Sequence, residues 1–220
     1  MTDGSLSLAA RLYLLTWDTD KSKANGTSHP NYLVRAGALT ELAQRGLLVD
    51  EDGLARSGSD TRTGDPVLDR VLELVEESKP RKWKSWVTHR STVTLDDVRD
   101  QLAGSGHLEI GSGLFSRKKY ALARPDVVKA LRSDAREILT GTTSPGEISE
   151  LDAAVVALAA GAEVRTFVSG KERKQYKDRL VALTDRSGAT APALKKVIEE
   201  VRIAVIVAVT TSAAISANGN

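Results

Sequence analysis

The stretch TGDPVLDRVLELVE, residues 63–76, decides the fold class of this chain. Asp65 followed by Pro66 is typical of a helix N-terminus, because the carboxylate accepts hydrogen bonds from free backbone N–H groups and proline is tolerated in the first turn. Apolar side chains then recur every three or four residues, which is the spacing of one helix face. The stretch therefore predicts an amphipathic helix that packs on a core and ends before Pro80.

Similar patterns along the chain predict a mainly α fold, a single helical domain with small β-hairpins. Ser5 or Ser7 is placed to cap the first helix, and Thr94 with Asp97 three residues on resembles a capping box. The polar residues 18–30 are expected to form a loop. Further helices are expected at residues 8–17, 32–45, 94–104, 126–139, 148–160, 171–183 and 194–215.

The last of these helices contains the most apolar run in the chain, residues 203–215. This run is well short of the roughly 20 residues that a membrane-spanning helix needs. We therefore expect a buried apolar C-terminal helix with other helices around it. Residues 1–5 are expected to be a flexible N-terminus, residues 6–215 one domain, and residues 216–220 a disordered tail.

Two β-hairpins are expected between the helices. Residues 47–54 contain the turn signal Asp-Glu-Asp-Gly and predict the first one. The second joins residues 107–110 to residues 120–122 through a tip at residues 111–119. This tip is predicted to be exposed, with both apolar and basic side chains.

The composition gives no support to catalysis, redox chemistry or metal binding. The chain has 220 residues and no cysteine, which removes disulfides and thiolate ligands and is compatible with a cytoplasmic location. Its three histidines lack the spacing of a helical zinc site, and neither a GxSxG nor a glycine-rich phosphate-loop motif occurs. The N-terminus carries no signal segment. We therefore expect a cytoplasmic protein that is not an enzyme, with no catalytic residue, metal or cofactor.

Positive charge is local, because the 31 basic and 29 acidic residues give a net charge of only +2. One basic cluster runs from Lys79 to Trp86 with the sequence KPRKWKSW, and His89 and Arg90 follow it. Tryptophans among lysines favour a membrane interface, where indole rings lie at the headgroup level. Alternatively, Trp83 and Trp86 pack inward and the lysines are merely solvated.

A second basic cluster lies at the tip of the predicted hairpin, where Leu114 and Phe115 precede Arg117, Lys118 and Lys119. Burying two such apolar side chains in a bilayer is worth roughly 1.5 to 3 kcal/mol each, and each cation adds about 1 kcal/mol near an anionic leaflet. These values favour weak, reversible membrane docking. An oligomer contact, or a tip folded back onto the domain, would also cover the apolar pair.

Several short segments occur in an order that is typical of one protein family. They are Leu6-Ser7-Leu8, Gly37, Glu41–Gly46 (ELAQRG), Thr63-Gly64-Asp65 with Leu68-Asp69, Gly106-His107-Leu108, and Glu199–Val209. Together they resemble the Golgi phosphoprotein 3 family over about residues 6–214. The resemblance implies a mostly helical, non-catalytic domain, which in eukaryotic members recognises phosphatidylinositol 4-phosphate and links enzymes to membranes.

The resemblance also implies a lipid site. Arg35 falls on a family arginine that contacts the lipid phosphate, which a guanidinium can hold through two hydrogen bonds. Arg90 and Arg99 are the nearest candidates for two further lipid-binding arginines. The pair Leu114 and Phe115 falls on the hairpin that enters the bilayer. We therefore expect a peripheral membrane-binding adaptor for phosphatidylinositol 4-phosphate or another acidic lipid.

Two other functions compete with this expectation. A helix, a glycine and a basic-tipped hairpin also occur in winged-helix proteins, with residues 111–119 as the wing, but the near-zero net charge and the acidic pair Asp96-Asp97 disfavour nucleic acid as the partner. The other alternative is an oligomeric scaffold whose apolar tip is buried in a contact between copies of the chain. Client proteins and the oligomeric state are left open by the sequence.

Overall fold

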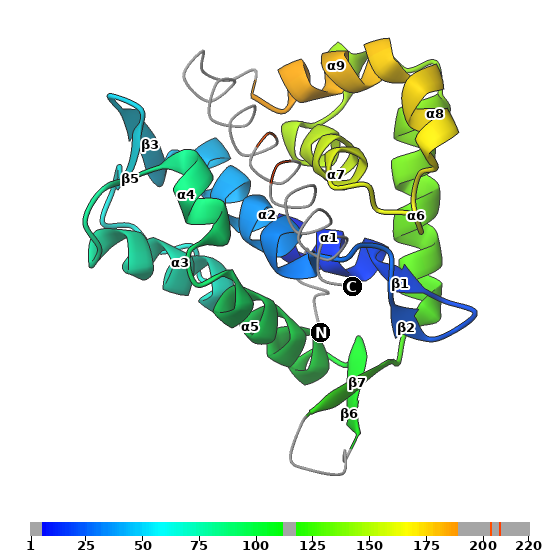
Figure 1. Cartoon of the computed structure of the whole chain (residues 1–220), viewed down its shortest axis with the longest axis horizontal. Helices are drawn as coiled ribbons and strands as arrows, with labels where there is room; N and C mark the ends of the chain where they lie inside the picture. Colours follow the sequence, from blue (N-terminus) through cyan, green and yellow to red (C-terminus); the bar gives the residue numbers. More distant parts are fainter. Residues whose placement is uncertain (1–5, 112–117, 189–202, 204–206, 208–220) are drawn as a thin grey trace, which may run out of the picture.

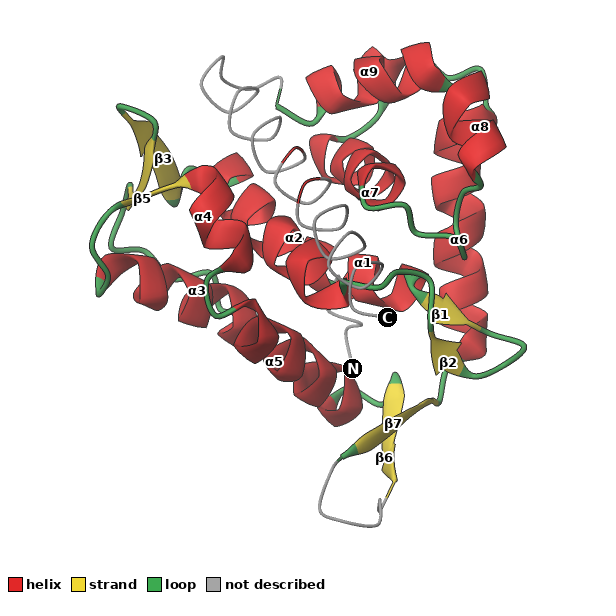
Figure 2. Cartoon of the chain, viewed as in Figure 1, coloured by secondary structure: helices red, strands yellow, loops and turns green. Residues whose placement is uncertain are grey.

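The computed structural model describes residues 6–111, 118–188, 203 and 207, and it confirms a mainly α domain (Figures 1 and 2). The helices are α1 (Leu8–Leu15), α2 (Pro30–Gln44), α3 (Pro66–Glu76), α4 (Trp83–Thr88), α5 (Ser91–Gly104), α6 (Pro125–Thr140), α7 (Glu150–Gly161), α8 (Gly170–Gln175) and α9 (Lys177–Arg186), with a short 3-10 helix η1 (Pro145–Glu147). The strands are β1 (Trp17–Asp18), β2 (Lys23–Ala24), β3 (Leu48–Glu51), β4 (Leu54–Ser57), β5 (Arg81–Lys82), β6 (Leu108–Gly111) and β7 (Lys119–Leu122).

Helix α2 is the central element. Every residue from Leu33 to Ala43 is buried, and the helix packs against α1, α3, α4, α5 and α7. The predicted left-handed glycine follows it at Gly46, where φ is +69°, a conformation that glycine adopts at little cost. The helices around α2 bury one contiguous core.

The segment ELAQRG, residues 41–46, joins α2 to its neighbours through polar contacts. Glu41 is buried, accepts a hydrogen bond of 2.6 Å from the backbone N–H of Leu8, and forms an ion pair with Arg45. The amide of Gln44 donates to the carbonyls of Glu150 and Ser187. These contacts fix α1, α7 and the end of α9 against the C-terminal half of α2.

The segment TGDPVLD, residues 63–69, forms the N-terminus of α3 as predicted. Asp65 accepts hydrogen bonds from the backbone N–H groups of Val67 and Leu68, at 2.8 and 3.0 Å. Asp69 accepts from the backbone N–H and hydroxyl of Thr63, at 2.6 and 2.7 Å. The carboxylates therefore satisfy the first turn of α3 and close the loop in front of it.

The tryptophans of the first basic cluster are part of the core. Trp83 and Trp86 have no exposed surface, and the indole N–H of Trp83 donates to Asp50 at 2.8 Å. The inward-packing interpretation is therefore confirmed for both rings. Just before them, Arg81 and Lys82 form β5, an edge strand beside β4 that the sequence did not predict.

Three helix or loop boundaries differ from the predictions. Helix α5 begins at Ser91 after Arg90, which has φ +50° and makes no side-chain cap, so the capping box expected at Thr94 is wrong. The helix expected at 171–183 is two helices, α8 and α9, that meet at Tyr176. The loop expected at 18–30 contains the short antiparallel pair β1 and β2.

The C-terminal helix can be compared with its prediction at two positions only. Ile203 and Val207 are helical as expected. Their exposed fractions are 48% and 54%, however, so the prediction of burial is wrong at these positions. Residues 1–5 and 216–220 lie outside the described residues. None of the helices that the structure describes has the length and apolar character needed to cross a membrane.

Candidate functional site: an arginine pocket beside the β6–β7 hairpin

The predicted hairpin is formed by β6 and β7, which follow α5 (Figure 1). Ile110 lies opposite Tyr120, and its exposed fraction is 52%. The side chains of Lys118 and Tyr120 bind the Asp100 carboxylate on α5, with the Tyr120 hydroxyl donating at 2.7 Å. These contacts tie the tip-proximal end of β7 to α5. The predicted insertion residues Leu114, Phe115 and Arg117 lie outside the described residues, and Lys119 begins β7.

A pocket of about 260 Å³ lies between the tip-proximal end of β7, the β1–β2 ladder, α1 and α5. It is lined by Tyr13, Trp17, Ser22, Lys23, Ala24, Arg99, Lys118 and Tyr120. We call it the Arg99 pocket. Three of its side chains are cations and three are aromatic, a combination suited to a small anionic group with polar substituents.

Arg99 is held in a fixed position in this pocket. Its Nε donates to the Tyr13 hydroxyl at 3.0 Å, and its Nη1 donates to Asp96 at 3.3 Å. The guanidinium carbon also lies over both tyrosine rings, 5.5 Å from the centroid of Tyr13 and 5.6 Å from that of Tyr120. Among the described residues, no acceptor binds its Nη2. A positioned guanidinium with a free donor is suited to binding an oxyanion.

The ionisation of the pocket follows from burial and charge. Burial raises the pKa of Tyr13, although the nearby Arg99 opposes the shift. Desolvation and the hydrogen bond to Asp100 raise the pKa of Tyr120. Hydrogen bonds from Lys118 and Tyr120 lower the pKa of Asp100. At neutral pH the tyrosines therefore keep their protons and Asp100 stays charged.

Arg35 and Arg90 lie together, but away from Arg99. The Nη2 of Arg35 donates to the backbone carbonyl of Arg90 at 3.0 Å. Arg35 is only 1% exposed, and its Nε and Nη1 have no hydrogen-bond acceptor in the described part of the chain. Its burial lowers its pKa to about 10. Arg90 is exposed and stands at the N-terminus of α5. The structure thus divides the three predicted lipid-binding arginines between two places, and the contact of each with lipid stays a prediction.

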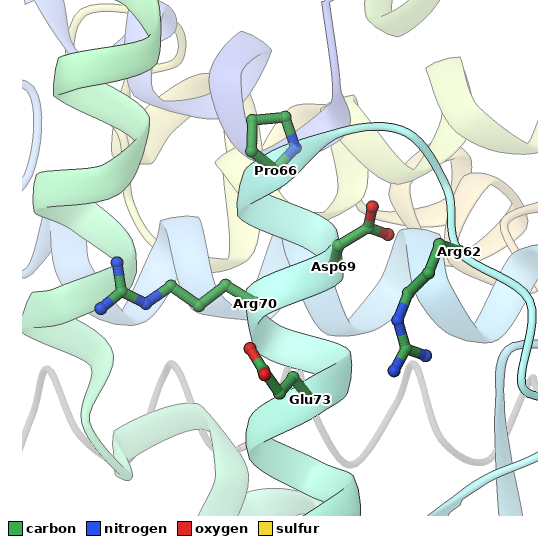
Figure 3. Close-up of a pocket in the computed structure, with 5 residues that line it drawn as sticks. All are labelled: Arg62, Pro66, Asp69, Arg70 and Glu73. Carbon is green, nitrogen blue, oxygen red and sulfur yellow. The ribbon is translucent and has the colours of Figure 1, made fainter.

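A second pocket, of about 440 Å³, lies on the outer side of α3 (Figure 3). Its arginines, Arg62 and Arg70, extend to opposite sides of the helix. Arg62 binds Glu76 through two hydrogen bonds, and Arg70 binds Asp97 at 3.0 Å. Asp69 is occupied by the loop in front of α3. Both cations of this pocket are paired with carboxylates, whereas the Arg99 pocket also contains Lys23, which forms no ion pair among the described residues. The pocket on α3 is therefore a poorer anion site than the Arg99 pocket.

The sequence indicated only part of the Arg99 pocket. Arg99 is predicted to bind a lipid headgroup and Lys118 to lie in the membrane-inserting tip, but Tyr13, Lys23 and Tyr120 were not identified. Tyr13 belongs to a largely apolar helix and Lys23 to a polar stretch, so neither carries a local signal of function. Only the packing of α1 against α5 and the pairing of β1 with β2 bring them together.

Comparison with known families places this geometry in context. Residues 8–201 match the family model described as Golgi phosphoprotein 3 (GPP34). A comparison with curated proteins found no match. The matched range contains every described element of the domain up to α9, including α2, α5 and the β6–β7 hairpin. The chain belongs to the Golgi phosphoprotein 3 family.

Proposed function

We propose that this protein is a peripheral membrane-binding adaptor that recognises an anionic phospholipid headgroup in the Arg99 pocket. The observation that carries the proposal is the Nη2 of Arg99, which has no acceptor among the described residues, in an open pocket beside the tip-proximal end of β7. Phosphatidylinositol 4-phosphate or another acidic lipid would supply the anion. The proposal includes no catalytic step and no cofactor.

The pocket and the hairpin support each other in this role. A headgroup phosphate in the pocket could accept hydrogen bonds from Arg99 and from Lys23, which has no ion-pair partner among the described residues. The hairpin that borders the pocket carries Leu114 and Phe115 at its predicted insertion tip. Exposed Ile110 extends the apolar surface toward the body of the domain. One docking event would therefore combine headgroup binding with apolar insertion.

Arg35 contributes to lipid binding in this proposal only if the segment around Arg90 moves. Its guanidinium lies beneath that segment and is almost fully buried. Arg90 is exposed, but it lies at the N-terminus of α5 and does not line the Arg99 pocket. Substituting Arg35 and Arg99 one at a time therefore distinguishes two modes of headgroup binding. Arg35 tests the contact that the family resemblance implies, and Arg99 tests binding in the Arg99 pocket.

Nucleic-acid binding is less well supported. In a winged-helix arrangement α5 would be the recognition helix, but it carries Asp96, Asp97 and Asp100. Carboxylates on that helix would repel the phosphate backbone. The pairing of these residues with Arg99, Arg70 and Lys118 reduces the repulsion but leaves no excess positive charge on the helix.

Co-flotation with liposomes tests the proposal. Vesicles of neutral lipid, of a generic anionic lipid, and of phosphatidylinositol 4-phosphate are compared at low and at physiological salt. Selective retention on the phosphoinositide indicates a specific headgroup site. Retention on all anionic vesicles indicates a general anionic-lipid site, and absence of retention on every vesicle contradicts the proposal.

Matched variants locate the site. Arg99→Gln and Lys23→Gln should each reduce retention on anionic vesicles several-fold. Arg70→Gln is the control, because it removes one arginine that also pairs with an α5 carboxylate but lies outside the Arg99 pocket. Equal retention of Arg99→Gln and the parent would exclude the Arg99 pocket as the headgroup site. Loss of retention in Arg35→Met alone would assign headgroup binding to the buried arginine.

A further inference from the structure

The basic cluster around β5 and α4 is not used by the proposed function. Between residues 79 and 90 the chain carries three lysines, two arginines and no acidic residue. The cations are Lys79, Arg81, Lys82, Lys84 and Arg90, and all five are exposed. We call them the β5–α4 cluster. With Trp83 and Trp86 in the core, the surface of this segment consists mainly of positive charge.

The cluster has no internal counter-charge. No carboxylate in the part of the chain that the structure describes forms an ion pair with any of the five residues, and Arg81 only stacks on Trp86, with its guanidinium 5.7 Å from the ring centroid. Three of the nearby carboxylates have other partners. Asp50 accepts from Trp83, Glu51 pairs with Arg56, and Glu76 pairs with Arg62.

Buried charge adds to the positive field of the cluster. The Arg35 guanidinium lies beneath Arg90 and donates to its carbonyl. His89, between α4 and Arg90, has a pKa lowered first by burial and then by Arg81, Arg90 and Arg35. Three elements, β5, α4 and α2, thus supply positive charge here, together with Arg90 just before α5.

The cluster and the hairpin lie at opposite ends of α5 (Figures 1 and 2). Helix α5 has 14 residues, which corresponds to a length of about 21 Å. Charges are screened over about 8 Å at physiological salt. The cluster and the hairpin are therefore more than two screening lengths apart, so each can bind a different partner.

We propose that the β5–α4 cluster binds an acidic segment of a partner protein. Carboxylates would pair with the lysines, and Arg81 and Arg90 could bind them through two hydrogen bonds. No aromatic ring of the segment is exposed for base stacking, which disfavours single-stranded nucleic acid. Pro80 and the charges on β5 oppose addition of a further strand, so the partner binds through side chains. Such a site would let one molecule bind a membrane and a client at once, although the inference does not depend on membrane binding.

Fluorescence anisotropy with a labelled ten-residue oligoglutamate tests the inference. The parent should bind the peptide, more weakly as salt is raised. The triple change Lys79→Gln, Lys82→Gln and Lys84→Gln should weaken binding at least tenfold. The control triple change, Lys171→Gln, Lys174→Gln and Lys177→Gln, removes the same number of exposed lysines from α8 and α9, where acidic residues are interspersed, and should weaken it less than threefold. Thermal unfolding of both variants confirms that they are folded.

Three outcomes would overturn the inference. Equal weakening in both triple variants would mean that the peptide senses only the overall charge. Duplex DNA with the same number of charges could bind more tightly than the oligoglutamate, and its binding could be weakened by the triple change in the cluster. That result would identify nucleic acid as the partner. Loss of retention on anionic vesicles in the cluster variant, with peptide binding unchanged, would assign the surface to the membrane. Peptide binding by a protein that is not retained on vesicles would leave this inference standing while the proposed function fails.

Discussion

Glu41 shows how a single side chain connects distant parts of this fold. Its carboxylate lies on the buried α2, yet it caps the first turn of α1 through Leu8, 33 residues earlier in the sequence, and pairs with Arg45 one turn along its own helix. A buried carboxylate is stabilising only while it is fully hydrogen-bonded. This requirement gives a physical reason for a glutamate in the ELAQRG segment.

We expect Glu41→Ala to lower the free energy of unfolding by about 3 kcal/mol, because the Leu8 N–H loses its acceptor and Arg45 loses its partner. Urea denaturation at pH 7 measures the change. Glu41→Gln retains one acceptor for Leu8 and should cost less. A loss below about 1 kcal/mol in the alanine variant would show that water replaces the carboxylate.

Arg35 presents the opposite case, a buried charge with few partners. Its pKa of about 10 lies below the ordinary value because burial disfavours the charged form, so the charge opposes folding at neutral pH, and this opposition is relieved as the pH rises through about 10. We expect Arg35→Met to leave the free energy of unfolding unchanged or to raise it by about 1 kcal/mol. The Arg90 carbonyl keeps a hydrogen bond from the backbone N–H of Val93. Urea denaturation tests this, and a loss above 2 kcal/mol would contradict it.

At the scale of elements, the ends of helices were predicted best where a capping side chain lies next to the helix in sequence. Asp65 and Ser7 cap α3 and α1 as expected. The start of α5 was missed because Arg90 does not cap it with a side chain. Its carbonyl is instead held by Arg35, 55 residues away, and such a contact leaves no local signal.

Helix α8 provides a prediction about pH. Glu172 accepts from the backbone and hydroxyl of Ser169 and from Arg136 of α6, which lowers its pKa to about 2. A lowered carboxylate pKa stabilises the fold above the ordinary value near 4.5, and this contribution is lost as the pH falls from there toward 2. Glu172→Gln should therefore be less stable than the parent at pH 7 and approach it at pH 2.5. Urea midpoints at both pH values test this, with Glu137→Gln on the exposed face of α6 as the control.

At the scale of the whole molecule, charge and apolar surface are separated. The hairpin and the Arg99 pocket lie at one end of α5, and the β5–α4 cluster lies at the other. The small net charge of +2 conceals this arrangement, because the carboxylates of α5 pair with Arg70, Arg99 and Lys118, while the β5–α4 cluster forms no ion pair with a described residue. Surfaces of different character suit an adaptor with two partners.

This separation predicts two salt responses in vesicle flotation. Retention of the parent on anionic vesicles should fall between about 0.01 and 0.15 M salt, since the screening length shortens from about 30 to 8 Å. Phe115→Asp should lower retention at both salt concentrations, because apolar insertion is not screened. Ala121→Asp, an exposed change on the same hairpin, is the charge-matched control. Equal effects of the two changes would show that added negative charge, and not loss of the apolar tip, weakens docking.

The sequence by itself determined the mainly α class, the position of most helices and both hairpins, because these depend on local periodicity, turn residues and caps. The family followed from the resemblance of several short segments, and the family match confirms it. It also indicated Arg35, Arg90 and Arg99 as candidate lipid-binding residues. Only the tertiary structure decided that Arg35 is buried while Arg99 lines a pocket with Tyr13, Lys23 and Tyr120. It likewise decided that Trp83 and Trp86 pack inward while the neighbouring cations are exposed. Exposure and charge pairing arise from contacts between residues far apart in the chain, and a pattern within one segment does not contain them.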